Sequence, residues 1–435
     1  MSNINHKHTI KHSTDIFYRY LNLQNDQYAR YLDIHGNEAR IFVVIPCFNE
    51  PDILTTLISL AECSPPKGIV SVLVVVNDAE NSIPEAVSQN NWTLDSIKNW
   101  QCQHPELFFN IQRIHAQALP KKWAGVGWAR KIGMDEAIRQ LARGGKPDGI
   151  IVSLDADSTV SKGYLQTIEN AFEENPISPF FLINFEHSLD YKGISSIEKD
   201  GIIRYELHMR YFKNAMARSG YPHAIHTVGS SFALKASAYV KQGGMNRRKA
   251  GEDFYFLHKL VLLGNYGNIY NATVFPAPRV SDRVPFGTGA ALKKWMEGSS
   301  ELLTTYSLSA FSHLKPLFSN PSKFWSLNKT EIENLFTQLD FNIQSFLRNS
   351  QSIDQLLELI SNCSNEEIFR KRFFHLFNAF WILKYLNFVH ESALMRADLR
   401  TESIRLLHSL GILHAPDISL ESLLKIYREI DKQTH

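Results

Sequence analysis

The sequence predicts an α/β fold, with a mostly parallel β-sheet followed by a region of α-helices. Short runs rich in Val and Ile alternate with helical segments from residue 40 onward, and the strand signal fades after about residue 290. The 435 residues, 44% of them hydrophobic, are enough for one large domain and a smaller second unit. We therefore expect three parts: an N-terminal extension (1–39), an α/β domain (40–290) and a helical C-terminal domain (291–435).

Five segments of the α/β domain have the composition of buried strands, with Val and Ile prominent. In chain order they are residues 41–45, 69–76, 107–111, 149–154 and 179–185. Helices are expected between them, including residues 51–63 and 128–143, and the second helix ends at Gly144-Gly145, a natural helix stop. This alternation is typical of βα units, in which the strands run parallel.

The region after residue 290 is expected to form several amphipathic helices. Its most apolar segment, 373–389, is interrupted by Lys384 and Asn387, so we interpret it as a buried helix and not as a membrane span. The basic residues 370–372, beside several aromatic rings, could face an anionic membrane surface. We favour the alternative, which is a core helix with a solvated basic edge.

The charge balance and the N-terminus limit the class of protein. Lys and Arg number 46 and Asp and Glu number 44, so the chain lacks the basic surface of a dedicated nucleic-acid-binding protein. Residues 1–14 are polar, unlike a secretory signal, and the four cysteines show no CxxC spacing. We therefore expect a cytoplasmic protein with reduced thiols, whose contact with the cytoplasmic face of a membrane would be peripheral.

Two carboxylates follow the expected strand 149–154 directly, as Asp155-Ala-Asp157. Open α/β sheets place their ligand sites at such strand ends. Two carboxylates one residue apart can share a divalent cation, Mg²⁺ or Mn²⁺, while a diphosphate supplies further oxygen ligands. The alternative is a turn and helix cap, because Asp, Ser and Thr also favour those positions.

Asp155-Ala-Asp157 is one of five motifs that occur in order along residues 40–290. The others are IFVVIPCFNE (41–50), VLVVVND (72–78), GVGWARKIG (125–133) and GED (251–253). With these motifs in this order, the chain resembles family 2 of the glycosyltransferases. The resemblance implies the GT-A fold, a Rossmann-like nucleotide-diphospho-sugar transferase fold. It also implies a bacterial-type enzyme that moves a hexose from a UDP- or GDP-linked donor to a glycan, lipid or small-molecule acceptor that the sequence does not identify.

The resemblance assigns nucleotide contacts to the ends of the first two strands. Pro46, Phe48 and Glu50 match the end of the first strand, where Glu50 could accept hydrogen bonds from ribose hydroxyls. Asp78 matches the acidic residue that meets the base, and a carboxylate there can accept an N–H of uracil or of guanine. The residues on either side of Asp78 depart from the family's Asp-Asp-Gly.

Arg130 and Lys131 match the family's Ala-Arg-Asn helix start, with Lys131 in place of Asn. The resemblance implies that Arg130 holds the nucleotide, and a second cation beside a diphosphate is chemically sensible. Asp155 is expected to serve both the nucleotide and the metal. The alternative is that both cations are solvated on the helix surface.

Glu252 and Asp253 open an expected helix after Gly251. The resemblance makes Asp253 the general base that takes a proton from the acceptor hydroxyl, with inversion at the anomeric carbon as the implied result. The alternative is that the pair only interacts with the helix dipole. Acceptor contacts are expected from residues 186–230 and from the C-terminal helices.

The resemblance implies a third metal ligand, in addition to Asp155 and Asp157, from the region that Arg279 to Arg283 occupies here, where the family commonly has a His and this chain has none. Asp282 could bind the cation there, or Arg279 and Arg283 could contact phosphate. An exposed ion pair within the loop is the alternative.

Two other functions compete with transfer of a sugar. A nucleotidyltransferase that makes a nucleotide sugar would release pyrophosphate, but the chain lacks the Gly-rich, Arg- and Lys-bearing loop that such enzymes carry after the first strand. A non-catalytic GT-A module would bind a nucleotide or a partner protein. Such a module is expected to have lost the carboxylates, and both acidic motifs are intact here.

Overall fold

The computed structural model describes residues 15–24, 29–32, 38–248, 251–281 and 287–433. The chain forms two compact units. Unit 1 comprises Met1–Ser195 and Thr227–Lys293, and unit 2 comprises Ser196–His226 and Lys294–His435. The domain boundary expected near residue 290 lies close to Lys293–Lys294, where the chain passes from unit 1 to unit 2. The sequence did not indicate that residues 196–226 belong to unit 2.

A nine-stranded sheet forms the centre of unit 1, in the order β1-β4-β3-β2-β5-β8-β7-β9-β6. β2 to β5 run parallel to one another, and β9 runs parallel to β7. The expected α/β architecture with a mostly parallel sheet and a helical C-terminal region is confirmed. The strands are β1 (Ala29–Tyr31), β2 (Ile41–Cys47), β3 (Val70–Ala79), β4 (Phe109–Leu119), β5 (Ile150–Ser153), β6 (Ser158–Val160), β7 (Phe180–Phe185), β8 (Phe232–Lys235) and β9 (Gly267–Pro276).

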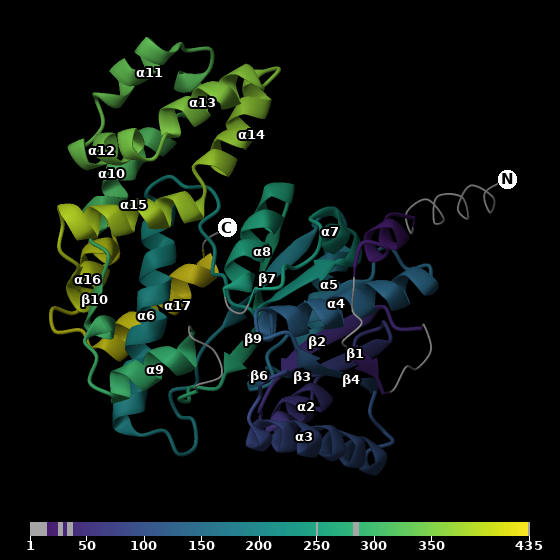
Figure 1. The fold of residues 1–435 in the computed structure, drawn as a ribbon. Coiled ribbons are helices and arrows are strands. Elements are labelled where there is room, and N and C mark those ends of the chain that lie inside the picture. The colour runs from purple at the N-terminus through teal and green to yellow at the C-terminus, as the bar shows by residue number, and fades with distance from the viewer. Residues whose placement is uncertain (1–14, 25–28, 33–37, 249–250, 282–286, 434–435) are drawn as a thin grey trace. The chain divides into compact units, whose positions relative to one another are not determined.

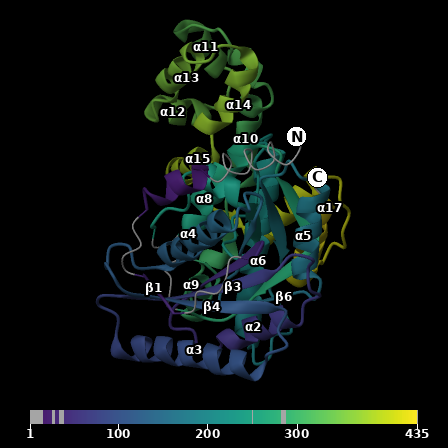
Figure 2. The same cartoon turned by 90° about the vertical axis from the view of Figure 1, so that its right-hand side faces the viewer.

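Helices cover both faces of this sheet, as Figures 1 and 2 show for α4 on one face and for α2 and α3 on the other. All seven residues of β2 are buried, which is the pattern of a strand covered on both faces. The helices of unit 1 are α2 (Ile53–Ala61), α3 (Pro84–Gln103), α4 (Val126–Arg143), α5 (Tyr164–Glu174), α7 (Ala236–Lys241) and α8 (Glu252–Leu260), while α9 (Thr288–Met296) crosses into unit 2.

Gly133 lets α4 lie close to the sheet. A Cβ at this residue would be 2.5 Å from Val44 Cγ1 and 2.9 Å from Val75 Cγ2. Interiors are too densely packed to absorb such overlaps without movement. The glycine therefore fixes the depth of α4, the helix that carries Arg130.

Unit 2 consists almost entirely of helices, apart from a two-stranded ribbon of β10 (Thr304–Thr305) and β11 (Ala397–Asp398). Side-chain caps mark where several helices begin, and Asn328 and Glu331 form a capping box at the start of α11. The helices are α6 (Ser196–Arg218), α10 (Leu308–Phe318), α11 (Lys329–Phe336), α12 (Phe341–Asn349), α13 (Ser352–Ser361), α14 (Glu366–Leu376), α15 (Ala379–Ser392), α16 (Leu399–Ser409) and α17 (Leu420–Gln433).

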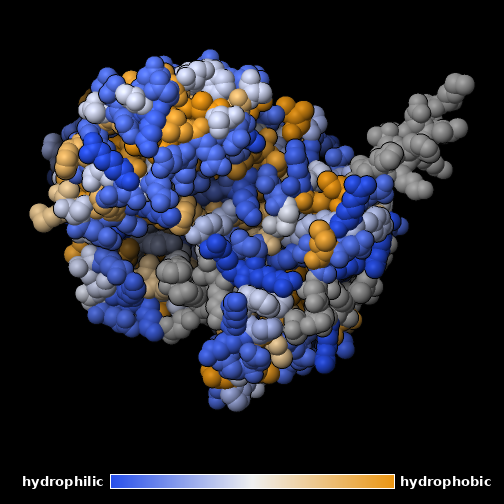
Figure 3. Space-filling model, turned by 45° about the horizontal axis from the view of Figure 1, so that its top comes forward, coloured by the Kyte–Doolittle hydropathy of each residue, from blue (hydrophilic) through white to orange (hydrophobic). Residues whose placement is uncertain are grey.

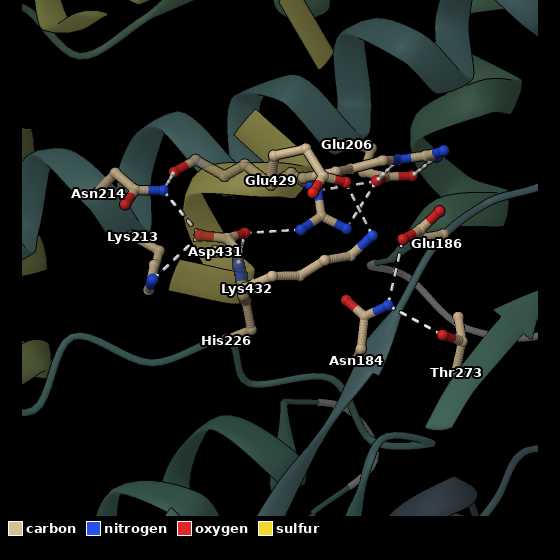
Figure 4. Close-up of polar contacts among 12 residues, drawn as sticks. Asn184, Glu186, Glu206, Lys213, Asn214, His226, Thr273, Glu429, Asp431 and Lys432 are labelled. Atoms are coloured by element: carbon tan, nitrogen blue, oxygen red, sulfur yellow. Dashed lines mark hydrogen bonds and ion pairs between the residues drawn. The ribbon is translucent and has the colours of Figure 1, made fainter. Parts of the chain in front are cut away.

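A buried carboxylate ties α17 to α6 in unit 2 (Figure 4). Asp431 Oδ2 accepts from Arg210 at 2.6 Å and contacts His226 Nε2 at 2.8 Å, and Oδ1 accepts from Lys213 at 3.0 Å and Asn214 at 2.9 Å. Burial alone would raise the pKa of Asp431, but these neighbours outweigh it and hold that pKa far below its usual range. The carboxylate is therefore charged and fully satisfied.

The aromatic residues beside the basic segment 370–372 belong to the core of unit 2. Phe373, Phe377 and Trp381 are buried, so the segment is the solvated edge of a core helix. Within the described chain, no helix is both long and apolar enough to cross a membrane. Exposed apolar side chains such as Phe341 are present in this unit, and Figure 3 shows orange areas interspersed with blue ones.

Candidate active site

Arg130 joins the two acidic motifs that the sequence singles out. It lies near the start of α4, and its side chain is 2% exposed. Its Nη2 donates to Asp155 Oδ1 at 2.5 Å, and its Nη1 donates to Glu252 Oε1. Asp155 follows β5, whereas Glu252 is the first residue of α8. The consecutive elements α4 and β5 and the distant helix α8 therefore meet at one buried arginine.

Two glycines make room for this arrangement. A Cβ at Gly229 would lie 2.9 Å from both Nη atoms of Arg130, and a Cβ at Gly127 would collide with the carbonyl oxygen of Arg248. Ser153 Oγ donates to the Gly229 carbonyl oxygen at 2.7 Å, which ties that loop to the end of β5. Gly229 thus makes room for the Arg130 guanidinium, and Gly127 allows α4 to approach the loop that precedes α8.

Burial dominates the electrostatics of the acidic pair at the start of α8. Burial raises the pKa of Glu252 to about 7, against the lowering effect of Arg130 and together with the raising effect of Asp253. Burial also raises the pKa of Asp253, again against Arg130. The site therefore contains carboxyl groups that titrate closer to neutral pH than usual, beside an arginine that stays charged.

Backbone contacts hold the Asp155-Ala-Asp157 turn in place. The N–H of Leu154 donates to the Val44 carbonyl oxygen at 3.1 Å, and Thr56 Oγ1 donates to the Ala156 carbonyl oxygen at 2.9 Å. The carbonyl oxygen of Asp157 accepts from Ala277 N at 3.1 Å. β2, α2 and the segment after β9 thus fix the turn, and the two carboxylates remain partly exposed at 36% and 26%.

Arg279 lies beside the second carboxylate of this turn. Its Nη2 is 3.7 Å from Asp157 Oδ2 and donates to Glu50 Oε2 at 2.5 Å. Glu50 is completely buried, and its other oxygen accepts from Asp52 N at 2.9 Å. The Glu50 carboxylate therefore positions Arg279, and this placement does not favour the predicted contact of Glu50 with ribose. Asp282 and Arg283 lie outside the described residues.

The end of β2 turns sharply after the two other residues assigned to the nucleotide. Pro46 is buried within β2, and Phe48 just beyond it is half-buried. Asn49 has a φ of 47°, in the left-handed region, and its N–H donates to Asn90 Oδ1 at 2.9 Å. An asparagine tolerates this conformation better than most residues, so the turn is encoded locally.

Asp78 is held as a charged carboxylate at the end of β3. Its Oδ1 accepts from Ala118 N at 2.7 Å, and its Oδ2 is 3.4 Å from His115 Nε2. Burial raises the pKa of Asp78, but His115 and the Ala118 N–H outweigh this effect and lower it. His115 was not among the predicted site residues. It lies in β4, four residues beyond the end of the predicted strand 107–111, and no sequence signal marks it.

Lys131 is not brought to Asp155 or Glu252. Its Nζ donates to Asp135 Oδ2 at 2.6 Å and to Tyr20 OH at 2.9 Å, and the residue is buried. Tyr20 and Tyr239 both donate to Asp135 Oδ1. The predicted contact of Lys131 with the nucleotide therefore does not fit the structure, because the ammonium is engaged in a buried structural cluster.

The turn at Asp155 and Asp157 offers two oxygen donors for a metal ion. Over the described part of the chain, no three His, Cys, Asp or Glu side chains are grouped so that they could hold a metal. Mg²⁺ is commonly held by one or two carboxylates together with substrate phosphates and water. Two partly exposed carboxylates fit that requirement once a diphosphate is bound.

Comparison with known proteins gives a likeness in fold only. No protein-family model and no curated protein matches the chain. Among solved structures, the chain is similar to S. aureus TarS at 14% identity and a TM-score of 0.40, with 72% of this chain and 53% of that chain covered. The chain thus spans about half the length of that structure.

Two shorter structures of S. aureus TarS, residues 1–349, are also similar. The complex with UDP aligns over 87% of this chain and 94% of that chain, with 14% identity and a TM-score of 0.38. The complex with UDP-GlcNAc aligns over 88% and 95%, with 14% identity and a TM-score of 0.39. Similarity at this level does not identify a substrate or a reaction.

Proposed function

We propose that this chain is a glycosyltransferase that moves a sugar from a UDP- or GDP-linked donor to a hydroxyl group of an acceptor. The observation that carries the proposal is the pair of contacts from Arg130 to Asp155 and to Glu252. They bring a carboxylate turn suited to a diphosphate into the same site as a pair of carboxyl groups with raised pKa values. The motif order along residues 40–290 supports the same function.

Asp253 is the proposed general base. Its raised pKa makes it a better proton acceptor than an ordinary aspartate, and α8 places it next to the residue that binds Arg130. It would take the proton of the acceptor hydroxyl while the hydroxyl oxygen attacks the anomeric carbon. The bond from that carbon to the diphosphate breaks in the same step, which gives inversion. Glu252 positions Arg130.

Positive charge beside the leaving diphosphate would come from Arg130 and Arg279. Both arginines contact the Asp155-Ala-Asp157 turn, at 2.5 Å and 3.7 Å respectively. A divalent cation, Mg²⁺ or Mn²⁺, bound by Asp155 and Asp157 would supply further neutralisation of the diphosphate.

The donor base is proposed to lie against Asp78. This carboxylate stays ionised because its pKa is lowered, so it can accept an N–H from uracil or guanine. Pro46 and Phe48 lie at the end of the neighbouring strand and would contact the nucleoside through their apolar surface.

Calorimetric titration of the full chain with UDP-glucose, UDP-galactose, UDP-N-acetylglucosamine and GDP-mannose tests the proposal. Metal-dependent binding of one donor is expected with Mn²⁺ present, and Asp157→Asn should abolish it. Asp253→Asn should bind that donor normally but lose its slow hydrolysis. If no nucleotide sugar binds with metal present, the proposed function is wrong.

The same preparation separates the competing functions. A non-catalytic module would bind the donor, and the wild type and Asp253→Asn would leave it equally intact. A nucleotidyltransferase would release pyrophosphate from a nucleoside triphosphate and a sugar phosphate, which an enzymatic pyrophosphate assay detects. A glycosyltransferase releases a nucleoside diphosphate and no pyrophosphate.

A further inference from the structure

We infer that the acceptor of the proposed reaction is anionic and that four cations near the starts of α4 and α8 bind it. This cationic cluster consists of Lys121, Lys122, Arg247 and Arg248. It lies on two loops of unit 1, one between β4 and α4 and the other ahead of α8. The prediction that the cationic cluster binds an anion is independent of the proposed function. The statement that this anion is the acceptor rests on that function.

Aromatic rings hold the first part of the cationic cluster. The Arg247 guanidinium is 5.0 Å from the ring centre of Trp128 and 5.6 Å from that of Trp123, and Lys122 Nζ is also 5.6 Å from Trp123. The two indoles pack edge to face at 5.6 Å. The ring contact keeps the Lys122 ammonium in place without neutralising its charge, in contrast to a contact with a carboxylate.

Arg248 connects the cationic cluster to the acidic pair. Its guanidinium is 3.7 Å from the ring centre of Tyr255, which follows Asp253 by two residues in α8. Arg248 is exposed, as is Lys122, and within the described residues neither cation pairs with a carboxylate. The charge of both side chains is therefore directed to solvent or to a ligand, and the ring that Arg248 contacts is two residues along α8 from the proposed base.

The start of α4 adds to the positive potential at this place. Gly127 allows the carbonyl group of Arg248 to approach the helix, so the two loops meet there. The helix is 18 residues long and has neither a side-chain cap nor an acidic residue in its first turn. Its N-terminal N–H groups therefore favour an anion near the same two loops. One carboxylate, Glu80, lies close by and accepts from Lys121 N at 3.0 Å.

The position of the cationic cluster assigns it to the acceptor. The donor diphosphate is proposed to lie at Asp155 and Asp157, where Arg130 and Arg279 already supply cations. Arg248 instead stacks on the helix that carries Asp253, so an anion bound there would be on the molecule whose hydroxyl Asp253 deprotonates. The chemistry fits a saccharide that carries phosphate or carboxylate groups, because guanidinium groups bind both in a bidentate manner.

Binding of two anionic probes tests the inference in the full chain. Tetragalacturonate supplies carboxylates, glucose 1,6-bisphosphate supplies phosphates, and maltotetraose is the uncharged control. We expect at least one anionic probe to bind, more weakly at 200 mM than at 50 mM NaCl, and maltotetraose to show no binding. The probe with the lower Kd identifies which anion the acceptor carries. If neither anionic probe binds, or maltotetraose binds equally well, the inference is wrong.

A double variant, Lys122→Ala with Arg248→Ala, shows whether the cationic cluster is the site. It should raise the Kd of the anionic probe at least tenfold and change the Kd of the nucleotide-sugar donor less than twofold. The matched control is Lys98→Ala with Lys241→Ala, which removes two exposed lysines elsewhere on unit 1 and should change neither Kd. An equal loss of affinity for the donor and for the anionic probe would assign the cationic cluster to the donor and overturn the inference. Binding of the donor to the wild type tests the proposed function separately.

Discussion

Replacement of Arg130 by methionine removes the charge at the centre of the candidate site and keeps most of its volume. Glu252 is 3% exposed, and Arg130 contacts both Glu252 and Asp155. Removing one partner of a buried ion pair leaves the other charge uncompensated, at a cost of about 3–5 kcal/mol in the free energy of unfolding. We expect Arg130→Met to lose stability of that order wherever Glu252 is ionised.

The loss is expected to depend on pH. With Arg130 present, the pKa of Glu252 is already raised to about 7, mainly by burial. Without Arg130 this pKa rises further, because the guanidinium lowers it. The folded variant then keeps a proton that the unfolded chain releases above the ordinary glutamate pKa of about 4.5, so stability falls as the pH rises from there to the folded pKa. The wild type loses the same stability up to its own Glu252 pKa of about 7, so the deficit should be small at pH 5, appear only above pH 7 and reach about 1.4 kcal/mol at pH 8.

Urea unfolding at pH 5 and pH 8, followed by tryptophan fluorescence, measures this deficit. Arg143→Met, at an exposed position of the same helix, is the control and should change stability by less than about 0.5 kcal/mol. Adding Glu252→Gln to Arg130→Met should restore most of the stability at pH 8, with a coupling energy of about 1–3 kcal/mol. An equal deficit at both pH values, or no restoration, would refute the reasoning.

Three further predictions concern the acidic pair, unit 2 and the packing of α4. Transfer activity should fall at acidic pH on a limb set by the raised pKa of Asp253, and Glu252→Gln should move this limb to lower pH because one of two like charges is gone; an unchanged pH–rate profile would contradict this. Asp431→Ala should destabilise unit 2 by about 3–5 kcal/mol because it removes the carboxylate that buried Lys213 contacts and one of the two that pair with Arg210. Hydrogen exchange in α17 should speed up, with Asp431→Asn less affected. Gly133→Ala should reduce stability by about 1–3 kcal/mol through overlap with the sheet, as measured by thermal melting. Gly163→Ala is the control and should melt like the wild type, because a Cβ at Gly163 meets only one atom, at 3.5 Å.

The strands that the sequence predicts are those with continuous apolar runs. β2, β3, β5 and β7 are covered on both faces, so nearly every residue is apolar, and composition alone marks them. β9 was not predicted, because buried, partly exposed and exposed residues are mixed along it, and β6 is only three residues long. The assignment of α6 to unit 2 was also missed, because an amphipathic pattern shows that a helix packs but not against which core.

The sequence predicted which residues belong to the candidate site, but it did not predict the contacts between them. Arg130, Asp155 and Glu252 were all assigned to the site, but their meeting depends on how distant loops converge. Lys131 was placed there because it occupies the Asn position of the family's Ala-Arg-Asn helix start, where a second cation could face a diphosphate. Successive residues of a helix point about 100° apart, and the acidic residue four positions later, Asp135, is the signal that identifies a partner for Lys131 along the helix.

The contact between α6 and α17 has a consequence for synthesis of the chain. Arg210 and Asp431 are 221 residues apart, and all of the contacts of Asp431 with α6 span similar separations. At a translation rate of about 5–20 residues per second, α6 would leave the ribosome roughly 10 to 45 s before its acidic partner. During that interval, the cations of α6 have no Asp431 to pair with. The ribosome meanwhile synthesises Thr227–Lys293, the second segment of unit 1. Unit 2 therefore closes only late in translation, and slowing the ribosome in the last hundred codons would prolong the time for which chaperones can bind α6.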